Sequence, residues 1–346
     1  MKKSEINANE IAKLAGVSRS TVSRVINDYK NVPAETRKKV MDMIEQYNYV
    51  PNISAQVLAG KKTQTIGLFM IETGHVSSDM ISNMLLASVI ESASSHGYYV
   101  LTQIIRGTDD AGSIRGVKDI FYQRRIDGGI FIGAANEEPF IEELIAEGYS
   151  VAIVDQELPG HYEVNRIVSN FDNHKGMRLA VQHLVNLNHT QIGHVSGDMK
   201  RYSGPSKLEG FYAAMEQFNL PIVQDWIIPA GFNEESGYHA LQQFIISGKQ
   251  LPTAIVMAND SVAFGAIRAL KEHGVQVPDQ ISIVGFDDHA LSERFQPALT
   301  TLRIDFSNMM ERLATSLIEQ IEKKRTTYTK ITVDMQLIER ESTKQK

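Results

Sequence analysis

The segment 19–27 (RSTVSRVIN) concentrates side chains suited to recognising a polyanion. At the helical period of 3.6 residues, Val22, Val25 and Ile26 fall on one side. The other side carries Arg19, Ser20, Ser23 and Arg24. Guanidinium and hydroxyl groups donate the hydrogen bonds that read guanine edges and contact phosphates in the major groove of DNA. The segment therefore predicts a helix that buries its aliphatic side and presents donors to DNA.

The sequence does not indicate catalytic chemistry. It contains no G-x-G-x-x-G, Walker, G-x-S-x-G, H-E-x-x-H or EF-hand spacing, and it has no cysteine. His183, His189 and His194 lie close in sequence, but isolated histidines of this kind are more often structural than metal ligands. The adjacent acids at 142–143 and 287–288 point their side chains apart. We therefore expect a non-enzyme with no catalytic residues, no cofactor and no metal.

The elements that must position the basic segment form a small helical module. Ser18 can cap the helix at 19–27, and it follows a turn at Gly16. Before the turn, residues 9–15 place Ile11, Leu14 and Ala15 on one stripe. A third helix over 34–47 repeats the period and carries the basic run 37–39 (RKK). Three short helices with this tight turn predict a helix-turn-helix domain.

Charge is divided along the chain. Residues 1–62 contain eleven Lys and Arg against six Asp and Glu, a net of +5, whereas the whole chain carries -6. The remaining residues therefore carry -11. A basic head on an acidic body is expected when one end meets a polyanion, although chance segregation of surface charge gives the same pattern.

From residue 65 onward, short apolar runs alternate with helical stretches. Examples of the runs are 65–71, 98–105, 128–132 and 151–154, and the rhythm resumes after about residue 173. Such alternation predicts βαβ units and parallel sheets. The expected fold is an α/β body of two doubly wound parallel-sheet halves, preceded by the small all-α domain. A helix over 308–323 and a strand over 331–339 are expected to complete the halves.

Length and composition agree with a multidomain globular protein. The chain has 346 residues, with 42% hydrophobic and 22% charged residues. Its longest apolar runs are far shorter than the roughly 20 residues needed to span a bilayer. The first ten residues (MKKSEINANE) are not followed by an apolar segment typical of a secretory signal. We expect a cytoplasmic protein associated with the nucleoid through DNA.

The residues of the head and of the segment after it resemble the LacI/GalR family of transcriptional regulators. The resemblance is carried by 8–18 (ANEIAKLAGVS), 21–27 (TVSRVIN), 49–52 (YVPN) and 55–60 (AQVLAG). It implies a DNA-binding head over 1–50, a hinge helix over 51–62, and a periplasmic-binding-protein-like body over 63–346 that binds an effector and dimerises. The first half of the body would comprise about 65–170 plus 305–329, and the second about 173–302 plus 331–340.

The resemblance also implies a set of DNA contacts. Arg19 and Ser20 would read bases and Arg24 would face the groove, although both arginines could instead contact only phosphates. In the family the hinge becomes helical on DNA, and the leucine matching Leu58 enters the minor groove. Packing of Leu58 against the body is the alternative, and Ile53 departs from a position that is often basic. The implied DNA-binding residues are Ser18, Arg19, Ser20, Thr21, Ser23, Arg24, Asn27, Asn52, Ala55 and Leu58.

For the effector, the resemblance implies a site between the two halves, at the carboxyl ends of the strands. The implied residues are Asp287, Arg201, Ser203, Lys207, Asn259 and Phe232. Simpler roles remain open: Asp287 as a turn residue, Asp260 beside Asn259 as only a helix N-cap, and Phe232 as a core residue. Lys207 keeps the charge of the arginine found in many sugar-responsive members but loses its fork.

Two features of the sequence leave the identity of the effector undecided. The loop 72–80 is several residues longer than usual, which makes its alignment uncertain. The cations Lys200, Arg201 and Lys207 would suit an acidic or phosphorylated sugar, or they could be solvated surface.

The function that follows is a sequence-specific repressor controlled by a small molecule. We expect a homodimer on a pseudo-palindromic operator, with a sugar or sugar acid as effector and carbohydrate catabolism genes as targets. The chain ends without a leucine heptad, so a dimer is expected rather than a tetramer. The alternative is a sugar-binding transport component that shares the body fold. The sequence does not decide between inducer and co-repressor, or whether a phosphoprotein also binds.

Overall fold

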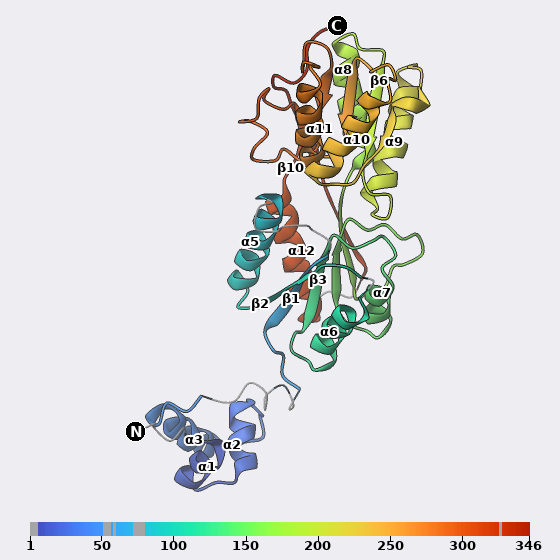
Figure 1. Ribbon diagram of the computed structural model, residues 1–346. Coiled ribbons are helices and arrows are strands. Elements are labelled where there is room, and N and C mark those ends of the chain that lie inside the picture. The colour runs from blue at the N-terminus through green and yellow to red at the C-terminus, as the bar shows by residue number, and fades with distance from the viewer. Residues whose placement is uncertain (1–5, 51–56, 58–59, 72–79, 109, 325–326) are drawn as a thin grey trace. The chain divides into compact units, whose positions relative to one another are not determined.

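The structure of this protein is a computed structural model that describes residues 6–50, 57, 60–71, 80–108, 110–324 and 327–346 (Figure 1). Contacts divide the chain into two compact units, residues 1–63 and 64–346. The border lies beside the predicted end of the hinge at residue 62. The predicted hinge residues Asn52, Ala55 and Leu58 lie outside the described residues, and so does most of the loop 72–80.

The first unit is built from three helices, α1 (Ala8–Ala15), α2 (Arg19–Ile26) and α3 (Ala34–Gln46). Its core is small and consists of Ile11, Ala12, Val22, Val25, Val32 and Val40. The predicted stripe on α1 is partly wrong, because Leu14 is 47% exposed. Since α1 turns Ile11 and Ala12 together toward α2 and α3, the buried stripe lies one residue to the side of the expected one.

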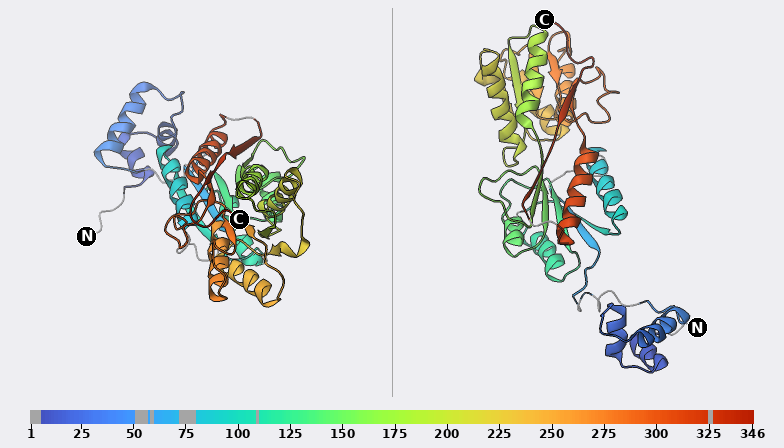
Figure 2. Two further views of the ribbon diagram at one scale, coloured as in Figure 1. Left: turned by 90° about the horizontal axis from the view of Figure 1, so that it is seen from above. Right: turned by 180° about the vertical axis from the view of Figure 1, so that it is seen from behind.

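The first half of the body is a parallel six-stranded sheet with helices on both faces (Figures 1 and 2). The sheet order is β11-β5-β4-β3-β1-β2. Its elements are β1 (Thr65–Ile71), α5 (Met80–Ser95), β2 (Tyr99–Ile105), α6 (Ala111–Tyr122), β3 (Gly128–Ile132), α7 (Pro139–Ala146), β4 (Val151–Val154), β5 (Arg166–Phe171), α12 (Phe306–Ile321) and β11 (Thr329–Val333). Alternate residues of β1 face different cores: Ile66 and Leu68 pack with α5 and α12, and Phe69 and Ile71 pack with α6 and α7.

The second half is a parallel sheet of order β7-β6-β8-β9. Its elements are α8 (Asn173–Asn186), β6 (Ile192–Ser196), α9 (Ser203–Gln217), a 3₁₀ turn (Gln224–Trp226), β7 (Ile227–Pro229), α10 (Glu234–Ile246), β8 (Ala254–Met257), α11 (Asp260–Glu272) and β9 (Ser282–Val284). Val256 of β8 packs in the core that includes α8 and α9, whereas Ile255 and Met257 pack with α10 and α11. Both halves are therefore doubly wound, as predicted.

The chain crosses between the halves near residues 172, 305 and 334. Two further strands lie at these crossings, β10 (Thr301–Ile304) and β12 (Met335–Ile338), and they pair antiparallel. The prediction of one tail strand over 331–339 in the second half is wrong for its first part. β11 joins β5 of the first half, with Thr329 opposite Ile167. The strand is interrupted at Asp334, whose side chain pairs with Lys175 and accepts from Met335 N.

The pattern of apolar runs does not predict strand β5, because half of the residues in its sequence, RIVSNF, are polar. Arg166, Ser169 and Asn170 are nevertheless at most 3% exposed. Burial of these side chains must be compensated by hydrogen bonds or ion pairs within the protein. For Arg166 and Asn170 such partners are present, and they form the polar network described below.

Candidate functional site

In the first unit, the candidate site is the exposed side of α2. Ser18 is the N-cap, and its hydroxyl accepts from Thr21 N at 3.1 Å. Val22 and Val25 are buried against α1 and α3. This fixes the rotation of the helix, so that the side chains of Arg19, Ser20, Ser23 and Arg24 are exposed.

The other predicted DNA contacts of the head are partly engaged in local hydrogen bonds. The hydroxyl of Ser18 lies 2.7 Å from that of Ser20 and 2.9 Å from that of Thr21. Asn27 Nδ2 donates to Ser23 Oγ at 3.3 Å. Arg19 and Arg24 make no ion pair with the part of the chain that the structure describes. The two guanidiniums are therefore the strongest exposed donors on α2.

In the second unit, a cavity of about 820 Å³ lies between the halves of the body. All six predicted effector residues line it: Arg201, Ser203, Lys207, Phe232, Asn259 and Asp287. They come from the loop after β6, from α9, and from the segments that follow β7, β8 and β9. These are the carboxyl ends of parallel strands, where ligands bind in open α/β sheets. The first half contributes Ile132, Gly133, Val154, Asp155 and Phe171, among others.

Lys207 is a buried cation enclosed by aromatic rings. Its Nζ donates to the Ala258 carbonyl at 2.6 Å and lies 3.6 Å from the ring centroid of Phe286. The rings of Phe171 and Phe232 lie at 5.3 and 5.8 Å. Burial lowers the pKa of Lys207, and the carboxylates of Asp287, Asp155 and Asp260 oppose that shift. The ammonium is thus stabilised by π faces and surrounding carboxylates rather than by water.

Asp155 joins the two halves across the cavity. It follows β4 with φ +66°, and its carboxylate accepts from the hydroxyl of Ser203, at the start of α9, at 2.7 Å. Burial raises the pKa of Asp155, while the Ser203 hydroxyl and the charges of Lys207 and Arg201 oppose the shift. Asp155 was not among the predicted residues. Its position directly after a buried strand was the available signal.

The alternative that Asp260 is the N-cap of α11 is wrong. Asn259 is the cap, and its Oδ1 accepts from Val262 N at 2.8 Å. The carboxylate of Asp260 is buried and accepts from His289 N, the Ser292 hydroxyl and the Thr301 hydroxyl at 2.7, 2.6 and 2.5 Å. Asp260 therefore ties the start of α11 to the segment after β9, which carries Asp287.

Asp287 and its neighbour Asp288 have different environments. Asp287 lies three residues after β9 with φ +118° and lines the cavity. Asp288 turns away from it and pairs with Arg303 and Arg340, at 2.6 and 2.7 Å. The side chains diverge, as predicted for adjacent acids.

Of the remaining predicted cations, Arg201 lies at the cavity and Lys200 does not. The guanidinium of Arg201 lies 5.7 Å from the ring centroid of Phe232, so these two side chains stack at the cavity wall. Lys200 is exposed and does not line the cavity in the described part of the chain. The hypothesis of a three-cation cluster is therefore wrong for Lys200.

Within the described ranges, no group of three or more His, Cys, Asp or Glu residues is arranged to hold a metal. The three clustered histidines have separate partners. His183 lies 3.0 Å from the Thr343 hydroxyl, His189 contacts Thr253 and the Lys344 carbonyl, and His194 contacts the Val256 carbonyl. Over the same described ranges, no helix is long and apolar enough to cross a membrane.

Both units match known families. Residues 8–52 match bacterial regulatory proteins of the lacI family, and residues 181–343 match a periplasmic binding protein-like domain. The chain is 31% identical over 325 residues to the HTH-type transcriptional repressor PurR of Actinobacillus pleuropneumoniae serotype 3 (strain JL03), covering 94% of each. It is 29% identical over 339 residues to the probable HTH-type transcriptional repressor ExuR of Bacillus subtilis (strain 168), covering 97% of this chain and 98% of that protein.

Among solved structures, the chain is similar to a lac repressor dimer bound to operator and the anti-inducer ONPF. The TM-score is 0.78 at 27% identity, covering 98% of this chain and 99% of that one. It also shares its fold with a complex of the transcriptional regulator CelR and cellobiose, with a TM-score of 0.75 at 24% identity and coverage of 97% and 99%.

The fold and the two candidate sites define a helix-turn-helix regulator with a separate ligand-binding body. The chain belongs to the lacI family of bacterial regulatory proteins, whose members similar to it are transcriptional repressors.

Proposed function

We propose that this protein is a repressor that binds a pseudo-palindromic operator as a homodimer. Binding of a small molecule in the cavity of the body either lowers or raises the affinity of the repressor for the operator. The observation that carries the proposal is the convergence of six residues, scattered over 87 positions of sequence from 201 to 287, on one cavity between two halves. A ligand bound there changes DNA affinity only if it binds one arrangement of the halves more tightly than the other.

The chemistry of the cavity supports a sugar as the effector, and carbohydrate catabolism genes as the targets. Asp287 and Asn259 offer oxygen acceptors for hydroxyl groups, and Phe232 offers a flat apolar face. Among the described lining residues, the cations are Arg201 and Lys207, whereas the carboxylates are Asp155, Asp198, Glu234, Glu235 and Asp287. Because excess negative charge opposes burial of an anion, this balance favours an uncharged sugar over a sugar acid or sugar phosphate. Relatives named PurR make purines the second candidate class.

The test is fluorescence anisotropy of the full-length protein on a labelled duplex enriched from genomic fragments. We expect tight binding that weakens steeply with salt, and a shift in affinity on adding one compound from a panel of neutral sugars, sugar acids, sugar phosphates and purines. The direction of the shift distinguishes inducer from co-repressor.

Arg19→Ala should weaken operator binding by roughly tenfold or more, since a base contact from arginine contributes about 1–3 kcal/mol. Arg294→Ala, which removes one exposed guanidinium from the body, is the matched control and should change affinity less than about twofold. Binding no tighter than to random DNA, or equal losses in both variants, would contradict the proposal.

A further inference from the structure

Two loops of the first half meet one loop of the second half beside the cavity. The loop after β3 places the backbone N–H of Asn136 2.8 Å from the carbonyl oxygen of Lys200, in the loop between β6 and α9. The loop after β4 places Asp155 against Ser203 at 2.7 Å. Closure of the halves on a ligand therefore depends on where these two loops of the first half are held.

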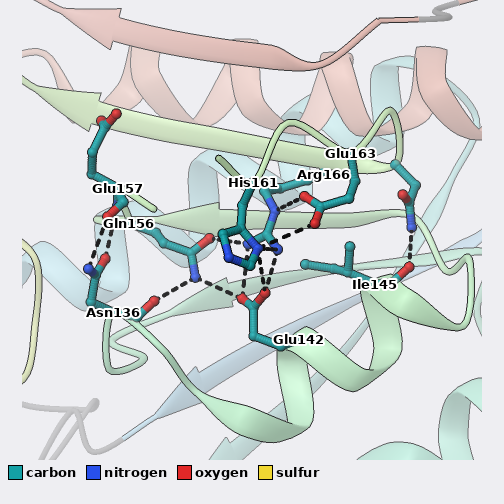
Figure 3. A network of polar contacts seen from close by, with 9 residues as sticks. Asn136, Glu142, Ile145, Gln156, Glu157, His161, Glu163 and Arg166 are labelled. Carbon is teal, nitrogen blue, oxygen red and sulfur yellow. Dashed lines mark hydrogen bonds and ion pairs between the residues drawn. The ribbon is translucent and has the colours of Figure 1, made fainter. Parts of the chain in front are cut away.

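The side chain of Asn136 joins these two loops to each other (Figure 3). Its Nδ2 donates to the Glu157 carbonyl at 3.0 Å, and its Oδ1 accepts from Glu157 N at 2.9 Å. The carbonyl of Asn136 in turn accepts from Gln156 Nε2 at 2.8 Å. The amide thus pairs with the backbone of Glu157 on both its donor and acceptor sides, as a neighbouring strand would. None of these three bonds involves the second half.

Gln156 is anchored in turn to the interior of the first half. Its backbone N–H and carbonyl bond to the side chain of Asn170 in β5, at 3.1 and 2.7 Å. Its Oε1 accepts from Arg166 at 2.7 Å. Arg166 is 1% exposed and also donates to Glu142 of α7 and to Glu163, at 2.9 and 2.7 Å. Figure 3 shows Gln156 and Arg166 together with Glu142 and Glu163.

A buried network of this kind is weak evidence for stability, because desolvation of its charges offsets much of their attraction. Its fixed geometry has a clearer consequence here, since the bonds made by Asn136 and Gln156 orient the two loops that face the second half. We infer that Asn136 is a positioning residue for closure: its side chain bonds to the backbone of Glu157 and so keeps the loop after β3 where the backbone N–H of Asn136 meets Lys200. Gln156, which Arg166 holds, supports the same loop through the main-chain carbonyl of Asn136. The inference rests on the proposed function in one respect, namely that the two halves close on an effector. Its test needs neither effector nor operator.

The experiment is amide hydrogen exchange, followed by mass spectrometry, on the full-length protein without effector. In Asn136→Ala, we expect exchange to rise in the peptide covering 198–204 of the second half, although the deleted side chain makes none of its bonds there. A rise of roughly five- to tenfold corresponds to the loss of about one net hydrogen bond from the closed arrangement. Asn136→Asp keeps the acceptor but loses the donor, and should give a smaller rise.

The matched control is Asn165→Ala. Asn165 also bonds backbone with its amide, to the carbonyls of Ile145 and Tyr149 at 2.8 and 2.7 Å, but those residues belong to the first half. Asn165→Ala should raise exchange near 145–149 and leave 198–204 unchanged. Unchanged exchange of 198–204 in Asn136→Ala and Asn136→Asp, or an equal rise in the control, would overturn the inference. If Asn136→Ala does not fold, the comparison of Asn136→Asp with the control decides it. Loss of operator or effector binding would leave this exchange result intact.

Discussion

At the scale of single residues, the body concentrates charged groups whose environment differs from that of the surface. Lys207 and Asp260 are both at most 2% exposed, yet neither lacks partners. Lys207 lies on the face of Phe286, and the carboxylate of Asp260 accepts three hydrogen bonds. Burial lowers the pKa of Lys207 and raises the pKa of Asp260, because a buried site disfavours the charged form of each group.

Burial raises the pKa of Asp260 to about 6, from an ordinary value of 3.8. A carboxyl with a raised pKa in the folded state contributes stability below pH 3.8, and this contribution is lost as the pH rises through 6. We expect Asp260→Asn to destabilise the body by about 1 kcal/mol near pH 5, because Asn accepts fewer hydrogen bonds. That deficit should disappear on going to pH 7.5, because ionisation of the native residue lowers the stability of the native protein by about 1.4 kcal/mol over this range and the Asn variant does not ionise. Urea unfolding at several pH values measures the difference.

Asp225→Asn removes an exposed carboxylate from the same half and is the control. It should show a difference from the native protein that does not vary with pH in this range. A constant deficit in Asp260→Asn would show that Asp260 ionises in the folded state as it does in the unfolded chain.

At the scale of elements, the head depends on helix ends because its core is small. Asn7 Oδ1 accepts from Asn9 N and Glu10 N, while Glu10 Oε2 accepts from Asn7 N at 2.9 Å, which makes a capping box at the start of α1. Ser18 caps α2 with its hydroxyl, which accepts from Thr21 N. Among the described residues of the head, six form the buried core, so the unit has little hydrophobic stabilisation to compensate for a lost cap.

We expect Asn7→Ala to destabilise the head by about 1 kcal/mol. Amide hydrogen exchange of α1 in the full-length protein should rise by about fivefold, the factor that corresponds to this free energy. Asn9→Ala changes a side chain of the first turn that is not part of the capping box, and it should leave exchange unchanged or slower, because alanine favours helix. Equal exchange in the two variants would mean that the capping box does not limit opening of α1.

At the scale of the whole molecule, the chain separates into a DNA-reading unit and a ligand-binding unit with separate cores. Such a division predicts that the two activities can be lost independently. Leu58 falls outside the described residues, so its role rests on the sequence, whereas Asp287 lines the cavity.

Leu58→Ala should weaken operator binding by roughly tenfold or more, because an inserted apolar side chain supports the bent DNA, and should leave effector affinity unchanged. Asp287→Ala should keep operator affinity within about twofold and lose the response to the effector. Anisotropy without and with effector measures the operator affinity and its response to the effector. Calorimetry measures the effector affinity. Unchanged operator affinity in Leu58→Ala would reject the insertion, and a normal dose response in Asp287→Ala would reject its place in the effector site.

The sequence by itself determined the features that depend on neighbouring residues. The periodicity of 22–26, the cap at Ser18 and the alternation of apolar runs predicted the helix-turn-helix unit and the two doubly wound halves. The resemblance to family motifs named six of the residues that line the cavity. These inferences succeed because helical period, capping and strand ends are local properties of the chain.

Only the tertiary structure decided the features that join distant segments. The Asp155–Ser203 contact spans 48 positions, and Arg166 bonds to Glu142 24 positions away. In β5, buried polar residues hide the strand from hydropathy, because their partners lie on other elements. The first tail strand, β11, joins the first half because it pairs with β5, a partner that lies far away in the sequence. From the sequence, a polar side chain is predicted to lie on the surface. Only the hydrogen-bond partners that it meets in the folded protein show that it is buried in the core.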